Sequence, residues 1–206
     1  MPGTIILTAI TIPEIVATKP ELNEGLNSVA TKCRTDSGPL PEGMLISPGK
    51  YKVNLDPLLE SGTIHSLSQD NLDPVDEEFP SLDSIKDYVL EVIIKYLYQY
   101  NTDRDFWANP ELEPGTKKFT RAYKAAIIAR SPIYRYIYEC DIEILYELIL
   151  AANFLQINSL LILTNNKIAE LMIGKNHLEI RQAFDIIPDF TPAEEAQLLE
   201  ENKWTD

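Results

Sequence analysis

Few side chains in this 206-residue sequence are of the types that catalyse reactions at neutral pH. The chain has two histidines and two cysteines, and none of them stands at the spacing of a nucleophile and its base: His65, His177, Cys33 and Cys140. His65 lies in a serine-rich segment that we expect to be a loop, and His177 is expected at the start of a helix, where a lone imidazole is usually a solvated polar group. A glycine-rich phosphate loop, a Gly-x-Ser-x-Gly elbow and a His-Glu-x-x-His motif are all absent from the sequence. The sequence therefore predicts a protein that is not an enzyme.

Metal and cofactor sites have equally little support. The segment Asp103-Arg104-Asp105 offers carboxylate ligands, but a solvated charge cluster is the favoured interpretation, as it is for Glu194-Glu195 and Glu200-Glu201 on a helix face. The two cysteines lack the paired spacing of a zinc site. We expect no metal and no cofactor, and two isolated cysteines favour a reducing compartment, the cytoplasm, the nucleus or both.

Acidic residues dominate the chain, but they are unevenly distributed. The net charge is −14, from 18 basic and 32 acidic residues; residues 1–100 carry −8, residues 101–136 carry +3 and residues 137–206 carry −9. An acidic chain makes a poor ligand for duplex nucleic acid and for an anionic membrane surface. The sequence also has no run of 18 apolar residues that could span a bilayer. We therefore expect no membrane partner and consider nucleic acid an unfavourable one.

One basic and aromatic segment, Lys117 to Lys124, keeps two interpretations. It could bind single-stranded nucleic acid or an acidic protein surface, because aromatic rings stack on bases and cations attract phosphates or carboxylates. It could equally be a soluble linker helix that offsets the acidic flanks. The second interpretation is favoured.

The elements of the first 136 residues are predicted from residue type and spacing. A strand is expected over Thr4–Ile10, which is rich in β-branched residues. Glycine and proline interrupt residues 20–76, which predicts short strands and loops in place of long helices. Apolar residues at three- and four-residue steps predict a helix over 84–100, and residues 101–136 are interpreted as an insertion or linker with a short helix at 119–130.

Four helices are predicted after residue 140. The first covers 142–157 with Asp141 as its N-cap, and 12 of the 17 residues from 141 to 157 are apolar. Asn158 caps the second helix, which Gly174 ends in the left-handed conformation, and Asn176 with Glu179 opens the third. The segment Thr191-Pro192-Ala193-Glu194 opens the fourth with a capping box. Short helices cannot cover this much apolar surface among themselves, so a partner is predicted to cover part of it.

The same C-terminal region resembles the S-phase kinase-associated protein family, the adaptors that link a cullin to F-box proteins in SCF-type ubiquitin ligases. The resemblance is carried by Leu148 to Ile157, Leu160-Leu161, Ile173-Gly174-Lys175, Glu179-Ile180-Arg181, Phe184-Asp185-Ile186, Asp189-Phe190-Thr191-Pro192 and Glu201-Asn202-Lys203-Trp204. More loosely, Glu78 to Leu82 and the helix that reaches Tyr100 are similar to the family's segment before a variable loop.

The resemblance implies an α+β, helix-dominated BTB/POZ fold, a small sheet flanked by helices, with extra C-terminal helices. It divides the chain into a BTB/POZ-like half over 1–100 with expanded loops, a basic insertion over 101–136, the remaining BTB/POZ helices over 137–173, and F-box-binding helices over 174–206. By matched position, Asn153 and Phe154 resemble residues that face the cullin. The positions that resemble the F-box side are Leu161, Ile180, Phe184, Ile186 and Trp204.

The function implied is a non-catalytic adaptor that bridges a cullin to F-box proteins and so promotes ubiquitin-dependent degradation. The sequence departs from the family in its first 75 residues, in the basic character of residues 101–136 and in Asn176-His177-Leu178-Glu179, where the family commonly has Thr-Pro-Glu-Glu. An F-box-binding scaffold that has lost its cullin contact is therefore a second hypothesis. A nucleic-acid-associated protein that uses residues 117–135 is a third.

Overall fold

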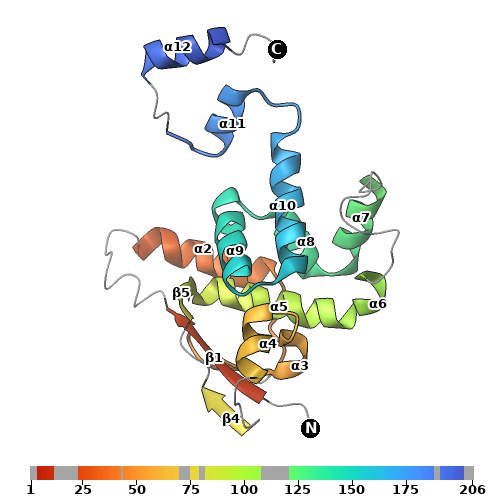
Figure 1. Ribbon diagram of the computed structural model, residues 1–206. Helices are drawn as coiled ribbons and strands as arrows, with labels where there is room; N and C mark the ends of the chain where they lie inside the picture. Colours follow the sequence, from red (N-terminus) through yellow and green to blue (C-terminus); the bar gives the residue numbers. More distant parts are fainter. Residues whose placement is uncertain are drawn as a thin grey trace. The chain divides into compact units, whose positions relative to one another are not determined.

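The computed structural model describes residues 4–11, 23–42, 44–69, 75–78, 82–107, 121–187 and 191–201 (Figure 1). The chain divides into two compact units, Met1–Lys167 and Ile168–Asp206, which are described separately. Helices dominate the described residues and accompany one small mixed sheet, which confirms the predicted α+β class. In the part of the chain that is described, no helix has the length and apolar character needed to cross a membrane.

The sheet of the first unit is built around its N-terminal strand. β1 (Thr4–Ile10) confirms the predicted strand. It pairs antiparallel with β3 (Lys50–Asn54) and parallel with β4 (Val75–Glu78) and β5 (Leu82–Lys86). β2 (Leu45–Ser47) pairs antiparallel with β3. The turn between β2 and β3 requires Gly49, whose φ is +76° and where a Cβ atom would lie 2.8 Å from the carbonyl oxygen of Ala9. This close approach brings the hairpin turn onto the end of β1.

The prediction of short strands and loops over residues 20–76 is wrong for its first part. Residues Asn23–Asp36 form α2, a helix of 14 residues. Glycine and proline, which interrupt helices, become frequent only from Gly38 onward. A helix can therefore form before that position. Ala30 and Cys33, three residues apart on α2, are both buried. Two short helices follow β3, α3 (Leu55–Leu58) and α4 (Gly62–Gln69), so His65 lies in a helix and not in the expected loop.

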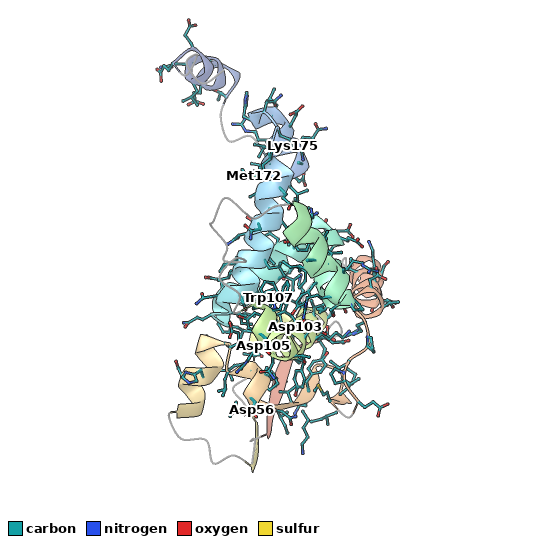
Figure 2. All side chains as sticks on the ribbon, turned by 90° about the vertical axis from the view of Figure 1, so that its right-hand side faces the viewer. Asp56, Asp103, Asp105, Trp107, Met172 and Lys175 are labelled. Atoms are coloured by element: carbon teal, nitrogen blue, oxygen red, sulfur yellow. The ribbon has the colours of Figure 1, made fainter. Side chains whose placement is uncertain are left out.

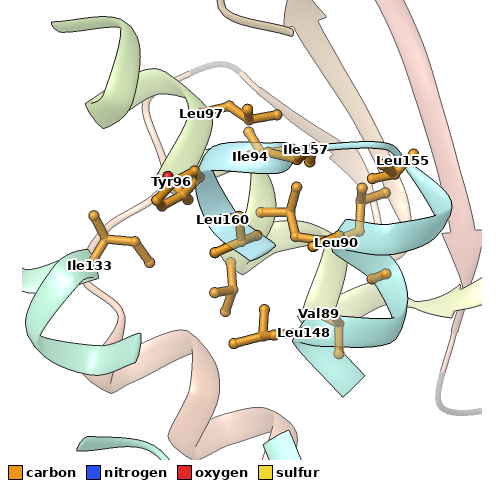
Figure 3. Packing of buried hydrophobic residues seen from close by; sticks show 14 of the residues in the cluster. Val89, Leu90, Ile94, Tyr96, Leu97, Ile133, Leu148, Leu155, Ile157 and Leu160 are labelled. Atoms are coloured by element: carbon orange, nitrogen blue, oxygen red, sulfur yellow. The ribbon is translucent and has the colours of Figure 1, made fainter. Parts of the chain in front are cut away.

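The central helix of the first unit is α5 (Asp87–Thr102), in which every residue from Asp87 to Leu97 is buried. In Figure 1 it runs between β1 and the helices α2, α8 and α9. The predicted start at residue 84 is too early, because Leu82 and Lys86 pair with β1 as part of β5. Burial on both sides explains why the apolar positions of α5 are not confined to one stripe. Figure 3 shows how Leu90, Ile94 and Leu97 of this helix pack against buried residues of α9 and α10.

Residues 101–136, interpreted from sequence as an insertion or linker, contribute to the core in their described second part. α6 (Arg104–Trp107), α7 (Arg121–Arg130) and α8 (Pro132–Glu139) occupy the described residues, and α7 corresponds to the helix expected at 119–130. Ile127, Ile133 and Tyr134 are among the buried core residues. The apolar spacing on α8 could have indicated this, but the flanking prolines and basic residues obscured it.

Asp103 anchors this region to α5 and is not the solvated group that its sequence context suggested. It is 7 % exposed, and its carboxylate accepts hydrogen bonds from Gln99 (2.8 Å) and from the guanidinium of Arg130 (3.0 Å). Burial acts to raise the pKa of Asp103, but hydrogen bonds from Gln99 and Arg130 outweigh it and lower the pKa. Trp107, labelled with Asp103 in Figure 2, donates its indole N–H to the Tyr134 hydroxyl at 3.1 Å.

Helices α9 (Ile142–Phe154) and α10 (Asn158–Met172) complete the first unit, and the division between the two units falls within α10. The predicted helix over 142–157 ends three residues early because Gln156 adopts a left-handed conformation with φ +53°. Asp141 has the extended backbone of an N-cap, but its side chain makes no capping hydrogen bond. Its carboxylate instead accepts a hydrogen bond from the ammonium of Lys32 at 2.8 Å.

The second unit contains α11 (His177–Ala183) and α12 (Pro192–Glu201). Gly174 has φ +75° and ends α10 as predicted. The capping box of Asn176 and Glu179 is present, with hydrogen bonds of 3.0 and 2.9 Å, so His177 is the first residue of α11 as expected. Thr191 and Glu194 exchange the corresponding bonds at the start of α12.

Candidate protein-binding surfaces

The described residues do not assemble the groups that catalysis or metal binding requires. No group of three or more His, Cys, Asp or Glu side chains among them is arranged to hold a metal ion. The thiols of Cys33 and Cys140 are free, and burial raises the pKa of both, in Cys140 to about 12. A thiol with a raised pKa is a weak nucleophile near neutral pH. The exposed apolar surfaces of the molecule are the more informative features.

The first surface lies on α9 and is called the α9 surface here. It consists of Tyr146, Leu150 and Phe154, which follow one another at four-residue steps and are 58 %, 58 % and 49 % exposed. The opposite side of the same helix is in the core, with Leu145, Leu148 and Ala152 fully buried. A helix that buries one apolar face and exposes another is typical of a docking surface for a second protein.

Contacts from α4 fix the C-terminal end of this surface. The last carbonyl groups of a helix have no partner within the helix. Here Thr63 donates its hydroxyl to the carbonyl oxygen of Phe154 at 2.8 Å, the Ser61 hydroxyl donates to the carbonyl of Leu155, and the Gly62 N–H donates to the carbonyl of Gln156 at 3.2 Å. These bonds hold the backbone of the turn while the Phe154 ring stays half exposed.

The space beside the Gln156 turn is tight. A Cβ atom at Gly62 would lie 2.7 Å from Oε1 of Gln156 and 3.1 Å from its Cβ atom. A glycine at this position lets α4 approach the turn closely enough for its first N–H groups to reach the carbonyls. The position of Asn153 and Phe154 therefore depends on α4, which is distant in sequence.

Asn153 and Phe154, which the resemblance assigns to the cullin side, are neighbours at the end of α9 and both are exposed. Leu161, assigned to the F-box side, lies on α10 and is partly buried against the core of the first unit. Carboxylates accompany the α9 surface: Glu143 is exposed, and Glu147 accepts a hydrogen bond from Lys86 at 2.7 Å. A partner would thus meet an apolar stripe with acidic groups beside it.

The second surface lies in the second unit and is called the α11 surface here. It consists of Ile180, Phe184 and Ile186, three of the residues that the resemblance assigns to the F-box side. Ile180 and Phe184 are one helical turn apart and partly buried, and Ile186 is 52 % exposed. The N–H of Ile186 donates to the carbonyl of Arg181 at 2.9 Å, which folds the chain back after Asp185 with its φ of +50°.

No described side chain of the second unit is buried, so its apolar groups are available to a partner. Several are strongly exposed: Ile173 (76 %), Leu178 (57 %) and Ile187 (84 %). Exposed aliphatic side chains of this kind indicate binding to another protein, because a partner that covers them removes apolar surface from water. Trp204, the remaining predicted residue of the F-box side, lies outside the described residues.

Tyr146, Leu150, Leu178 and Ile187 were not among the predicted site residues. The four-residue spacing of Tyr146, Leu150 and Phe154 was visible in the sequence. In a helix that is apolar nearly all round, however, spacing alone does not tell the covered face from the exposed one.

Together these features define a class of protein: a helix-rich α+β protein that offers two exposed apolar helical surfaces for binding other proteins. Comparison with known proteins agrees with this class. Residues 158–205 match the family described as "Skp1 family, dimerisation domain".

The matches to two relatives cover most of the length of those relatives. An S-phase kinase-associated protein 1 homolog of Tetrahymena thermophila is 38 % identical over 123 residues, which are 60 % of this chain and 69 % of that protein. SKP1-like protein 12 of Arabidopsis thaliana is 33 % identical over 146 residues, 71 % of this chain and 83 % of that protein. A shorter match of 68 residues, 33 % of this chain and 43 % of the relative, is 46 % identical to the E3 ubiquitin ligase complex SCF subunit sconC of Aspergillus fumigatus.

The chain belongs to the Skp1 family. The predicted family and the BTB/POZ-like α+β fold are thereby confirmed. Proteins of this family are non-catalytic subunits, so the prediction that the protein is not an enzyme is confirmed as well.

Proposed function

We propose that this protein is the adaptor subunit of an SCF-type ubiquitin ligase, in which it bridges a cullin to F-box proteins. The relatives named as Skp1 homologs and as an SCF subunit support the adaptor role. The observation that carries the bridging role is the presence of two apolar surfaces, one in each unit, on helices whose ends are fixed by capping or by contacts from α4.

In this proposal the α9 surface, with Asn153 and Phe154 at its end, contacts the cullin. The Phe154 ring is the anchor, since aromatic side chains that a partner covers dominate many interfaces and half of this ring is still exposed. The α11 surface, with Leu161 and Trp204, contacts the F-box. An F-box helix would lay its apolar face against Ile180, Phe184 and Ile186, which is a common mode of helix recognition.

Reconstitution tests the proposal with purified components. The full chain is mixed with a cullin N-terminal region and with an F-box protein, and complexes are separated by size-exclusion chromatography. A ternary complex supports bridging. A complex with the F-box protein alone supports the alternative, a scaffold that has lost cullin binding, and binding to neither contradicts both.

Matched variants assign the surfaces. Phe154→Glu should abolish cullin binding, whereas Ile46→Glu on β2, where the side chain is 51 % exposed, should not. Ile180→Ala should weaken F-box binding, whereas Gln182→Ala, an exposed polar residue two positions away and therefore on another face of α11, should have little effect. Equal effects within either pair would contradict the assignment of that surface.

We further propose that the protein resides in the cytoplasm, the nucleus or both, which its two free cysteines suit. Imaging of the protein with a fluorescent fusion partner tests this location. Exclusive localisation to a secretory compartment would contradict it.

A further inference from the structure

A groove in the first unit lies apart from the α9 surface and has no role in the function proposed above. It is called the α2–α5 groove here, and its cavity volume is about 660 Å³. α2 and α5 form its two sides, Tyr51 of β3 lies at its floor, and its rim is formed by Leu40, Pro41, Glu42, Leu45 and Pro48. Its size suits a side chain and part of the backbone of a bound peptide.

Acidic groups outnumber basic groups in the lining of the groove. Glu42, Asp87 and Glu91 contribute three carboxylates, and Arg34 contributes the one guanidinium. Arg34 donates to Asp87 at 2.6 Å and to Glu91 at 3.1 Å, and Lys95, outside the lining, pairs with Glu91 at 2.8 Å. The two inner carboxylates are therefore matched by two cations, and Glu42 at the rim adds a further negative charge.

Two groups of the groove have raised pKa values because they are buried. Burial raises the pKa of Asp87 even though Arg34 lies beside it, so the guanidinium does not fully offset the loss of water. Burial also raises the pKa of Tyr51, and the charges of Glu91 and Asp87 raise it further.

Apart from Glu42, the rim of the groove is apolar. Leu40, Pro41, Leu45 and Pro48 lie along it, and the Leu45 side chain is 57 % exposed. A lysine or arginine side chain has an aliphatic stem that packs on apolar surface and a charged end that seeks carboxylates. The exposed Leu45 side chain and the Glu42 carboxylate, both in the lining, therefore match the two parts of such a side chain.

We propose that the α2–α5 groove is a docking site for a basic peptide segment of a partner protein, with a lysine or arginine side chain inserted between Leu45 and Glu42. The inserted cation lies near Glu42, its stem covers Leu45, and the flanking residues of the segment lie along the rim. Charge complementarity selects this occupant, because an acidic segment would place its carboxylate beside that of Glu42.

Fluorescence anisotropy with labelled peptides tests the proposal on the full-length protein. The probe is a seven-residue peptide, Ala-Val-Ala-Arg-Ala-Val-Ala with blocked ends, and matched peptides carry Gln or Glu in place of the central Arg. The Arg peptide should bind more tightly than the Gln peptide, and the Glu peptide should not bind. Equal binding of the Arg and Glu peptides, or no binding of the Arg peptide at millimolar concentration, would overturn the proposal.

Variants test whether the groove itself is the site. Glu42→Gln should weaken binding of the Arg peptide about 3- to 5-fold, the range of a partly exposed ion pair, and Leu45→Ser should weaken it as well. Glu143→Gln removes an exposed carboxylate from α9 and should leave the affinity unchanged. If Glu143→Gln has the same effect as Glu42→Gln, attraction by the overall charge of −14 explains the binding and the proposal fails.

Sedimentation velocity of the protein alone tests one other occupant. A monomer at all concentrations agrees with the proposal. A dimer that Glu42→Gln dissociates would assign the groove to a second copy of the chain and overturn the assignment to a partner protein. Because neither assay contains a cullin or an F-box protein, their outcomes are independent of the proposed adaptor function.

Discussion

The substitution Phe154→Ala tests whether Phe154 contributes mainly to the binding of a partner or mainly to the stability of the fold. Phe154 is 49 % exposed, so the free protein gains only part of the roughly 1.5 to 3 kcal/mol that full burial of such a side chain provides. Its removal should lower the free energy of unfolding by about 1 kcal/mol, which corresponds to a decrease in Tm of roughly 2 to 4 °C at this chain length.

The effect on binding should be much larger. An aromatic anchor that a partner covers completely costs about 2 to 4 kcal/mol on truncation to alanine, or roughly 30-fold to several hundred-fold in Kd. Isothermal titration calorimetry with a cullin N-terminal region measures this change, and differential scanning calorimetry of the same preparation measures Tm.

Leu148→Ala is the matched control on the same helix. Leu148 is fully buried, so its truncation should cost about 2 to 5 kcal/mol of stability. The binding affinity of the folded fraction should change little. The reasoning would be refuted if Phe154→Ala lowered Tm as much as Leu148→Ala does, or if it left the Kd for the cullin within about 2-fold of the original value.

Three further predictions concern the fold. Asp103→Asn should lower Tm at pH 7, because it weakens the ionic contact with Arg130. The pKa of Asp103 in the folded protein lies below its ordinary value of 3.8, so this contact stabilises the fold fully above pH 3.8. The difference in Tm should vanish as the pH falls through the lower folded pKa. A difference in Tm that does not decrease at all as the pH is lowered below 3.8 would contradict this account. Burial raises the pKa of Cys140 to about 12, so its thiol should react slowly with Ellman's reagent at pH 7.5. It should react rapidly in about 8 M urea, which unfolds small domains. A rapid reaction of the native protein would contradict this prediction and show that the thiol is accessible. Asn176→Ala removes one hydrogen bond of the capping box with Glu179 and should destabilise α11 by about 1 kcal/mol. Hydrogen exchange of the α11 amides should become faster. Unchanged exchange would show that the cap is dispensable.

Local sequence signals predicted the elements whose ends depend on nearby residues. The strand Thr4–Ile10 has the predicted bounds, and both capping boxes form where Asn176 and Thr191 indicated them. These predictions succeed because a cap or a short β-branched run involves atoms only a few residues apart. The residues of the α11 surface also came from the sequence, through the family resemblance.

Elements whose ends depend on distant residues were predicted less well. The helix α2 was missed, α5 begins after a strand that only pairing with β1 creates, and α9 ends where α4 supplies donors to its carbonyls. Asp103 was expected to be solvated and is buried, because Arg130, 27 residues away, returns to pair with it. Such contacts join positions that no local pattern connects.

The sequence by itself determined that this acidic chain has a large apolar surplus in its C-terminal helices and lacks the groups of an enzyme. The tertiary structure alone decided which apolar residues are surplus. Leu148 and Leu150 are chemically identical and two residues apart, yet one is fully buried and the other is 58 % exposed. The reason is that α5 covers one side of α9, and in helical geometry two residues correspond to a rotation of about 200°. The same packing brings α2 and α5 together, and with them the carboxylates of the α2–α5 groove.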